Sequence, residues 1–183
     1  SAVTTERMFF CCSRLINVPT FNTSNVTNMY GMFDQCSSLT TVPSLDTSKV
    51  TTMGYMFNQC TSLTSVPQFN TASVTNMYRT FRNCTSLRTI TIGDGVTSIG
   101  NYAFLYCYSL TSVKIGKGVT SIGLWAFRDC TSLPSIEIPD NVISIGKCAF
   151  MGCAKLASAY IGKGVTSIGA EAFENCTSLM SID

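Results

Sequence analysis

The sequence predicts a right-handed α/β repeat solenoid of about eight stacked units, with short strands on one face and short helical turns on the other. Three observations support this fold class: residue columns that recur every 23 or 24 positions, apolar residues that alternate with polar ones, and turn residues between the apolar segments. Self-similarity at a period of 20–50 residues indicates a repeat architecture. One unit cannot bury its apolar side alone, so the units must stack.

Four residue types keep step along the chain. Cysteine sets the register, with a spacing of 24 residues from Cys12 to Cys84 and of 23 residues from Cys84 to Cys176. A phenylalanine lies three residues before each cysteine of this column, a leucine three residues after it, and a small or β-branched residue three further on. We expect the phenylalanine and cysteine columns to form the core, with the members Phe33, Phe57, Phe81, Phe104, Phe127, Phe150, Phe173, Cys36, Cys60, Cys84, Cys107, Cys130, Cys153 and Cys176.

The units come in two forms. Residues 1–87 carry 24-residue repeats of the form MFxxCSSLTxVPxFxTSxVTNM, and residues 88–183 carry 23-residue repeats of the form AFxxCTSLxSIxIGxGVTSIG. The phenylalanine, cysteine and leucine columns cross the boundary without a break. We therefore expect one continuous domain over residues 1–183.

The spacing within a unit predicts its local structure. Val113 and Ile115 alternate with polar neighbours, which is strand periodicity. In residues 1–87 a proline such as Pro43 follows the inward valine, and it has no N–H to donate, so strands there must be short or interrupted. Glycines in segments such as 116–118 supply the turns. The apolar spacing of four, five and eight residues from Ile122 to Cys130 predicts one face of a short helix.

These two repeat forms resemble those of the BspA-like leucine-rich repeat surface proteins. The second form matches their 23-residue repeat, and the first resembles a companion 24-residue repeat often found in the same large proteins. The resemblance covers essentially the whole chain. It implies a curved leucine-rich-repeat stack, display on a bacterial or protist surface and adhesion to host proteins or other cells, without catalysis.

Composition argues against several classes of function. The 183 residues contain no histidine, which removes the commonest general base and metal ligand. No carboxylates recur as a pair, so we expect no enzyme, no catalytic residue, no bound metal and no cofactor. Charged residues make up only 12% and the net charge is +2, without the clustered Lys and Arg that phosphate binding needs. No apolar run reaches about 18 residues, so we expect no membrane insertion.

The cysteine column allows two interpretations. It can be a disulfide ladder or a metal site, or a column of buried thiols, since free cysteine is among the most buried residue types. Zinc sites need clustered pairs, and stacked side chains point in parallel, whereas disulfides need Cβ atoms that face each other. Buried thiols are therefore favoured. Cys11 and Cys148 lie outside the column and are predicted to be the reactive or exposed thiols.

Positions that vary between units face solvent, and binding can occur only there. Period 2 places one such set on the outer side of the strands, namely Thr91, Lys114, Glu137, Tyr160 and Asp183, and Arg88 just before the first strand is a further candidate for ligand binding. This face is either a ligand-binding surface or a solvated sheet whose Ser and Thr side chains support neighbouring strands.

A second variable set lies near the phenylalanine column and includes Tyr55, Tyr102 and Trp125. Tyr and Trp are common interface anchors, and their rings can stack on sugars. The alternative is that each ring covers the edge of its neighbour's helix.

We expect a surface-displayed module that binds a host or cell-surface protein or a glycan, with no nucleic-acid partner. Such a chain is located at the cell surface or secreted, with its signal and anchor outside these residues. The alternative is a structural unit, either a spacer in a longer surface protein or a subunit that stacks end to end with itself. It is suggested by two termini that carry no polar capping unit and that join nearly in phase with the repeat.

Overall fold

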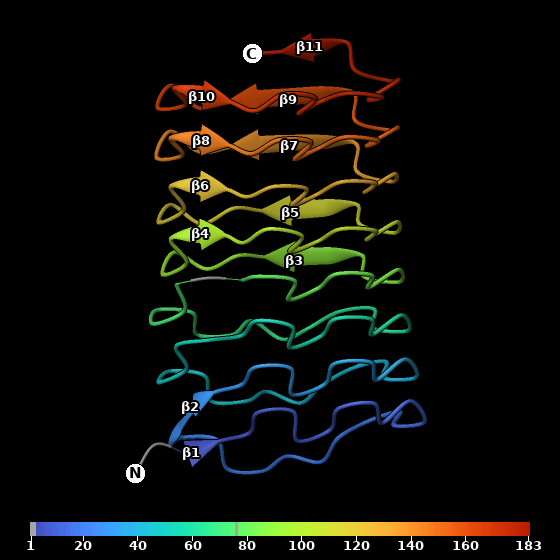
Figure 1. Ribbon diagram of the computed structural model, residues 1–183, viewed down its shortest axis with the longest axis vertical. Coiled ribbons are helices and arrows are strands. Elements are labelled where there is room, and N and C mark those ends of the chain that lie inside the picture. The colour runs from blue at the N-terminus through green and yellow to red at the C-terminus, as the bar shows by residue number, and fades with distance from the viewer. Residues whose placement is uncertain (1–2, 76) are drawn as a thin grey trace.

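Successive turns of the chain stack on one another in a β-solenoid of about eight turns, with the two termini at opposite ends of the stack (Figure 1). This computed structural model describes residues 3–75 and 77–183. A continuous apolar core runs through the stack from Val18 to Cys176. Each described turn of the solenoid therefore buries its apolar side chains against the neighbouring turns.

The strand-face column of the 23-residue units is confirmed. It consists of β3 (Thr89–Thr91), β5 (Ser112–Lys114), β7 (Ser135–Ile138), β9 (Ser158–Ile161) and β11 (Ser181–Ile182). All pairings are parallel and in repeat register, and they form two separate sheets, β3–β5 and β7–β9–β11. The sequence did not predict this division.

A second column of short strands was also not predicted. It contains the four-stranded parallel sheet of β4 (Ser98–Ile99), β6 (Ser121–Ile122), β8 (Ser144–Ile145) and β10 (Ser167–Ile168). At the N-terminal end, β1 (Val3–Thr4) pairs with β2 (Val26–Asn28), and a single bridge joins Asn28 to Thr52. Each 23-residue unit thus contributes two strands rather than one.

The 24-residue units carry few strands, as their prolines predict. Within residues 3–75 and 77–88 the strands are β1 and β2, and none includes the segments around Pro19, Pro43 or Pro67. A proline in a strand removes a ladder donor. The stack continues through this region without an ordered strand face.

The predicted helical turns are wrong, since the described residues contain no helix. The segment after each second strand folds as consecutive β-turns, in which two residues adopt positive φ, such as Trp125 (φ 56°) and Asp129 (φ 58°). A left-handed residue cannot continue a right-handed helix. The same pair of positions is left-handed in the other units, where it is held by residues as different as Tyr102, Gly31 and Asn83.

The hydrogen bonds of these turns explain why they replace a helix. Within the turn, Cys130 N–H donates to the Phe127 carbonyl at 3.2 Å. Phe127 N–H instead donates to the Ala149 carbonyl of the next unit at 2.7 Å, and Trp125 N–H donates to the Lys147 carbonyl at 3.1 Å. Half of the turn's backbone hydrogen bonds therefore join neighbouring units, whereas those of an α-helix would lie within one segment. These hydrogen bonds between the turns of neighbouring units, here called the turn ladder, recur in both repeat forms.

The core columns pack as expected. Neighbouring phenylalanine rings from Phe9 to Phe173 stack with centroids 4.9–5.5 Å apart and planes within 14° of parallel. The cysteine column lies beside them, and from Cys36 to Cys176 each thiol donates to the phenylalanine carbonyl of the preceding unit, as Cys60 does to Phe33 at 3.0 Å. All ten cysteines are free, and the column is buried from Cys36 to Cys176, which confirms the buried-thiol interpretation there, whereas Cys12 in the first unit is exposed.

One prediction about the off-column cysteines is wrong. Cys11 is exposed as expected, but Cys148 is only 2% exposed. Its thiol is enclosed at the turn ladder, where it donates to the Glu171 carboxylate at 3.1 Å. Burial, together with the nearby Glu171 charge, raises the pKa of the Cys148 thiol, so it is neither exposed nor activated.

Candidate binding site on the strand face

The strand-face residues singled out in the sequence lie next to one another. Thr91 of β3 stands opposite Lys114 of β5, and Glu137 of β7 stands opposite Tyr160 of β9. All four are exposed, as is Arg88, which lies one residue before β3. This arrangement follows from the alternation of side chains along each strand, which turns one residue in two away from the core.

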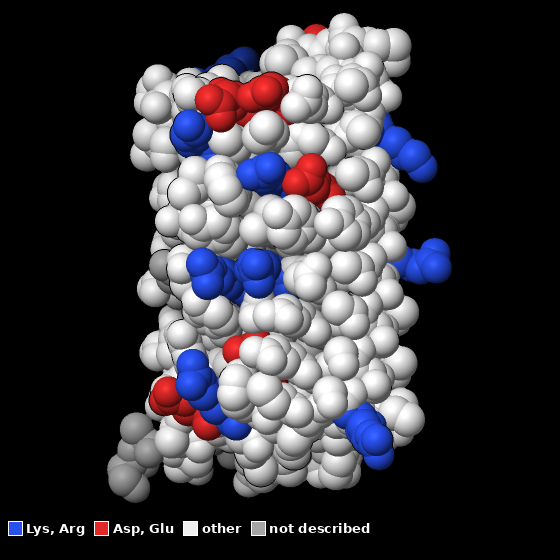
Figure 2. All heavy atoms as spheres, turned by 45° about the vertical axis from the view of Figure 1, so that its right-hand side comes forward, with Lys and Arg blue, Asp and Glu red and all other residues white. Residues whose placement is uncertain are grey.

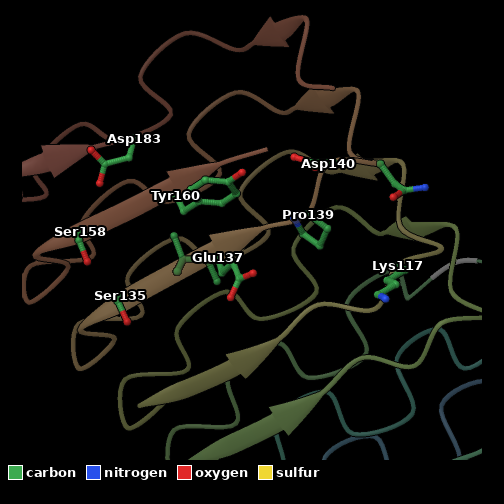
Figure 3. Close-up of a pocket in the computed structure, with 10 residues that line it drawn as sticks. Lys117, Ser135, Glu137, Pro139, Asp140, Ser158, Tyr160 and Asp183 are labelled. Carbon is green, nitrogen blue, oxygen red and sulfur yellow. The ribbon is translucent and has the colours of Figure 1, made fainter. Parts of the chain in front are cut away.

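Two hollows lie over this face. The larger, of about 740 Å³, is bordered by residues of β7 and β9 and of the turns beside them, and Figure 3 shows Glu137 and Tyr160 in it with Lys117 at its side. The second, of about 660 Å³, lies over β5 and includes Lys114. The two hollows share Lys117, Glu137 and Pro139 in their linings.

The charges around these hollows are not paired with one another. In residues 3–75 and 77–183 the ion pairs are Arg128–Asp129 at 3.2 Å and Lys147–Glu171 at 3.6 Å, both elsewhere. Lys114, Lys117 and Glu137 therefore present unpaired charges to a hollow. Unpaired charges on a concave surface are available to a partner of complementary charge.

Two carboxylates at the rim have a structural role. The Asp94 carboxylate accepts the backbone N–H of Lys117 at 2.8 Å, and that of Asp140 accepts the backbone N–H of Lys163 at 2.9 Å. Each bond joins a turn to the equivalent turn of the next unit. Gly118 permits this close stacking, because a Cβ there would collide with the Asp94 carbonyl. Lys117 and Asp140 were not predicted as site residues, because Gly-Lys-Gly at 116–118 indicates a turn, although the change to Pro-Asp-Asn in the next unit marks the place.

The predicted aromatic residues form a strip on a different part of the surface. Ring centroids are 5.3 Å apart for Tyr30–Tyr55, 6.1 Å for Tyr78–Tyr102 and 5.5 Å for Tyr102–Trp125. Most of these contacts are edge-to-face, and all the rings are partly buried. The rings do not form a coplanar platform, because the edge of one ring packs against the face of its neighbour.

Arginine side chains cover much of the remaining ring surface. The Arg79 guanidinium lies 5.4 Å from the Tyr55 ring and 4.9 Å from the Tyr102 ring, and it donates to the Tyr55 hydroxyl at 2.8 Å. Arg128 lies 4.5 Å from the Trp125 ring. Such contacts favour internal packing of the strip over sugar stacking.

The overall surface carries little charge. In the view of Figure 2, charged residues form small separate groups on a largely uncharged surface. Within the described part of the chain, no group of three or more metal-ligating side chains comes together. No helix among the described residues could cross a membrane.

Comparison with known proteins places the chain in a family. The profile described as BspA type leucine rich repeat region matches six copies over residues 55–180. A second profile, described as Mycoplasma protein of unknown function, DUF285, matches residues 3–104. Each match covers more than half of the chain. The search of curated proteins found no match.

Two solved structures support the same assignment. The leucine rich repeat protein of T. pallidum is 31% identical over 60% of this chain and 51% of its own, with a TM-score of 0.58. A leucine rich cell surface protein of Faecalibacterium prausnitzii A2-165 is 26% identical over 99% of this chain and 64% of its own, with a TM-score of 0.55. The chain thus spans between half and two thirds of the length of these two structures. Its family is that of the BspA-type leucine-rich repeat proteins, to which the chain belongs, and its N-terminal repeats also belong to the family described as Mycoplasma protein of unknown function, DUF285.

Proposed function

We propose that this chain is a non-enzymatic binding module of a cell-surface protein, and that it recognises a protein partner through the strand face of residues 88–183. The observation that carries the proposal is the set of unpaired charges at the two hollows, beside the exposed ring of Tyr160. The description of the Faecalibacterium prausnitzii relative as a cell surface protein supports the location.

A protein partner suits this face better than a polyanion or a neutral glycan. Lys114 and Lys117 are positive, whereas Glu137 is negative, so a uniformly anionic ligand meets repulsion as well as attraction. A neutral sugar leaves these charges unused, and the aromatic rings that stack on sugars lie elsewhere and pack on one another. Tyrosine is enriched at protein interfaces, and charges of both signs allow a complementary protein surface to be distinguished from others.

The test compares two surfaces of the same chain. The purified chain is applied to immobilised collagen, laminin and mucin and to a glycan array, and its binding is compared with that of a charge-matched unrelated protein. We expect binding to at least one protein surface, and a loss of about tenfold or more in K114A/Y160A. The matched variant Y102A/W125A, which changes the aromatic strip, should bind as the parent does.

Both variants are first compared with the parent by thermal unfolding, since Tyr102 and Trp125 are partly buried. Binding to no surface above the unrelated protein would refute the proposal. Binding lost in a folded Y102A/W125A but kept in K114A/Y160A would move the site to the aromatic strip.

A further inference from the structure

The ladder of hydrogen bonds beside the strand face has one break. At the position after each core leucine, the backbone N–H donates to the equivalent carbonyl of the preceding unit: Arg88 to Thr64 at 3.2 Å, Thr111 to Arg88 at 2.8 Å and Ala157 to Pro134 at 2.8 Å. Pro134 holds this position in the unit after Thr111. It accepts from Ala157 but has no N–H to donate toward Thr111.

A second proline lies at the other end of the same strand. Gly162, which follows β9, donates its N–H to the Ile138 carbonyl at 2.9 Å. The equivalent residue after β7 is Pro139, which again has no N–H. The strand β7 therefore lacks both flanking donors on its side toward β5, and the strand pairing is interrupted between β5 and β7, which remain neighbours.

The 660 Å³ hollow lies over this break. Its lining joins Val113 and Ile115 from the β5 side to Glu137 and Pro139 from the β7 side, and Lys114 borders it. Through the residues that it shares with the larger hollow, the depression continues past β9 to Asp183. A strand spacing of about 4.8 Å makes it roughly 15 Å long from β5 to β11.

The charges divide along this length. Lys114 and Lys117 stand on the β5 side of the break and outnumber the one carboxylate there, Asp94, which accepts the Lys117 N–H, whereas Glu137, Asp140 and Asp183 stand toward β7, β9 and β11. One oxygen of the Asp140 carboxylate accepts the Lys163 N–H, and the other is free for a ligand within the described structure. A matching ligand must therefore present an anion and a cation separated by one to two strand spacings, which is about 5–10 Å.

An extended peptide has this form. Its side chains two residues apart lie on the same face and are about 7 Å apart. A nucleic acid is uniformly anionic and is repelled by the acidic side. The side-chain methylenes of a peptide can also contact the apolar groups of Val113, Pro139 and Tyr160.

We propose that the hollow across the β5–β7 break binds an extended peptide segment with an acidic and a basic residue two positions apart. The acidic residue lies over Lys114 and Lys117, and the basic one over Glu137 and Asp140. The inference rests on the proposed function, because it names the chemistry of the protein segment that the strand face recognises.

The test uses three peptides that differ only in charge: Ac-Gly-Asp-Gly-Lys-Gly-NH2, its Asp–Asp analogue and its Lys–Lys analogue. Each is titrated into the ¹⁵N-labelled chain, and amide shifts of Val113, Lys117, Glu137 and Tyr160 are followed by NMR. We expect the mixed peptide to bind about tenfold more tightly than either analogue, with shifts confined to β5, β7, β9 and their turns.

Charge reversal then tests the direction of the assignment. In K114E/K117E the site becomes acidic throughout, so the mixed peptide should weaken about tenfold and the Lys–Lys analogue should become the preferred ligand. The variant K49E/K155E makes the same change in net charge at two exposed lysines outside both hollows, and it should behave as the parent does.

The variant Pro134→Ala/Pro139→Gly restores both missing donors and should weaken the mixed peptide at least threefold as the sheet closes. Equal binding of the three peptides, an equal effect of K49E/K155E, or undiminished binding after the prolines are replaced would refute the inference. If these tests fail while K114A/Y160A still abolishes binding to a matrix protein, the proposed function stands and the peptide assignment falls.

Discussion

The two halves of the solenoid share a core but differ in their faces. Residues 3–87 and 88–183 have the same phenylalanine and cysteine columns and the same turn ladder, with rings stacked at similar distances on both sides of the boundary. Yet the second half has nine strands among its described residues, whereas the described part of the first half has two. The core and the turn ladder are therefore sufficient to maintain the stack.

The difference shows what the strands contribute. In the second half they hold Lys114, Glu137 and Tyr160 in register at a defined spacing, which a binding face needs. In the first half the residue at the corresponding outward position is a proline, such as Pro43 or Pro67. Side chains that could vary for recognition are thus absent from that column.

The largest expected effect is the loss of stability at alkaline pH, and its measurement tests whether both halves depend on one core. Burial raises the pKa of Cys36 in the first half and of Cys107 in the second to about 12, so folded thiols keep their protons well above neutral pH. In the unfolded chain a cysteine thiol has a pKa of about 8.5, so it loses its proton near that pH. Between these values the unfolded state binds fewer protons. Stability is therefore complete below about pH 8.5 and falls as pH rises, by up to about 1.4 kcal/mol per pH unit for each thiol.

With several such thiols, we expect the chain to unfold before about pH 11, in one transition. Circular dichroism between pH 7 and 11.5 measures it, and a C11S/C12S variant, which changes exposed thiols, should give the same curve. Two separate transitions would mean that the halves have independent cores.

A second test compares the ring column in the two halves directly. Phe57 and Phe127 are both fully buried and stack on the next ring at 5.3 and 5.2 Å. Each change to alanine should lower the unfolding free energy by about 3–5 kcal/mol, because it removes a core ring and leaves a cavity. Urea titration measures the loss, and Tyr160→Ala, at a 40% exposed ring, is the control. A loss for Phe57→Ala less than half of that for Phe127→Ala would show that the strands, and not only the rings, set core stability.

The repeat period predicted the stack, the core columns and the strand-face neighbours, because residues in one column share one environment. It could not predict the turn ladder. The spacing from Ile122 to Cys130 fits a helix face, and the left-handed residues that exclude a helix include Trp125 and Tyr102, whose types do not signal positive φ. Inter-unit hydrogen bonds determine that conformation, and they exist only once the units stack.

The candidate site was predicted only in part for a related reason. The residue columns place Lys114 beside Glu137, but the lining of the hollow also includes Pro139, which interrupts the pattern in a single unit, as Pro134 does. Departures from the repeat, rather than the repeat itself, mark the place where the surface changes shape. The aromatic residues were predicted as a set, but the contacts of Arg79 with Tyr55, Tyr78 and Tyr102 were not.

A third prediction concerns the junction of the halves. Arg79 lies over Tyr55 and Tyr78 of the first half and over Tyr102 of the second. Arg79→Ala should lower the unfolding free energy by about 1–2 kcal/mol through the lost cation–π and hydroxyl contacts. The exposed Arg88, replaced in the same way, should change it by less than about 0.5 kcal/mol. Equal effects in urea titration would mean that the strip does not join the halves.

The smallest effect addresses why the first half lacks strands. Pro67 holds the position that Lys114 holds in the β3–β5 ladder, but it has no N–H to donate. Pro67→Thr restores a hydrogen-bond donor, which should stabilise the folded chain by about 0.5–1.5 kcal/mol. It also removes the restriction that proline places on the unfolded chain, which should destabilise the fold by about 0.4–1 kcal/mol. The net change in stability should therefore stay below about 1 kcal/mol.

Because the expected change in stability is small, hydrogen exchange of the backbone amide is the measurement that tests whether the proline prevents strand pairing. If proline alone prevents pairing, the amide that Pro67→Thr introduces should exchange at least about tenfold more slowly than an unpaired amide, whereas Gln68→Thr next to it should leave exchange unchanged. Fast exchange of the introduced amide would show that the 24-residue unit holds this segment too far from its neighbour to pair. The extra residue of the longer repeat, and not its proline, would then be what separates a stacking half from a half that can display a binding face.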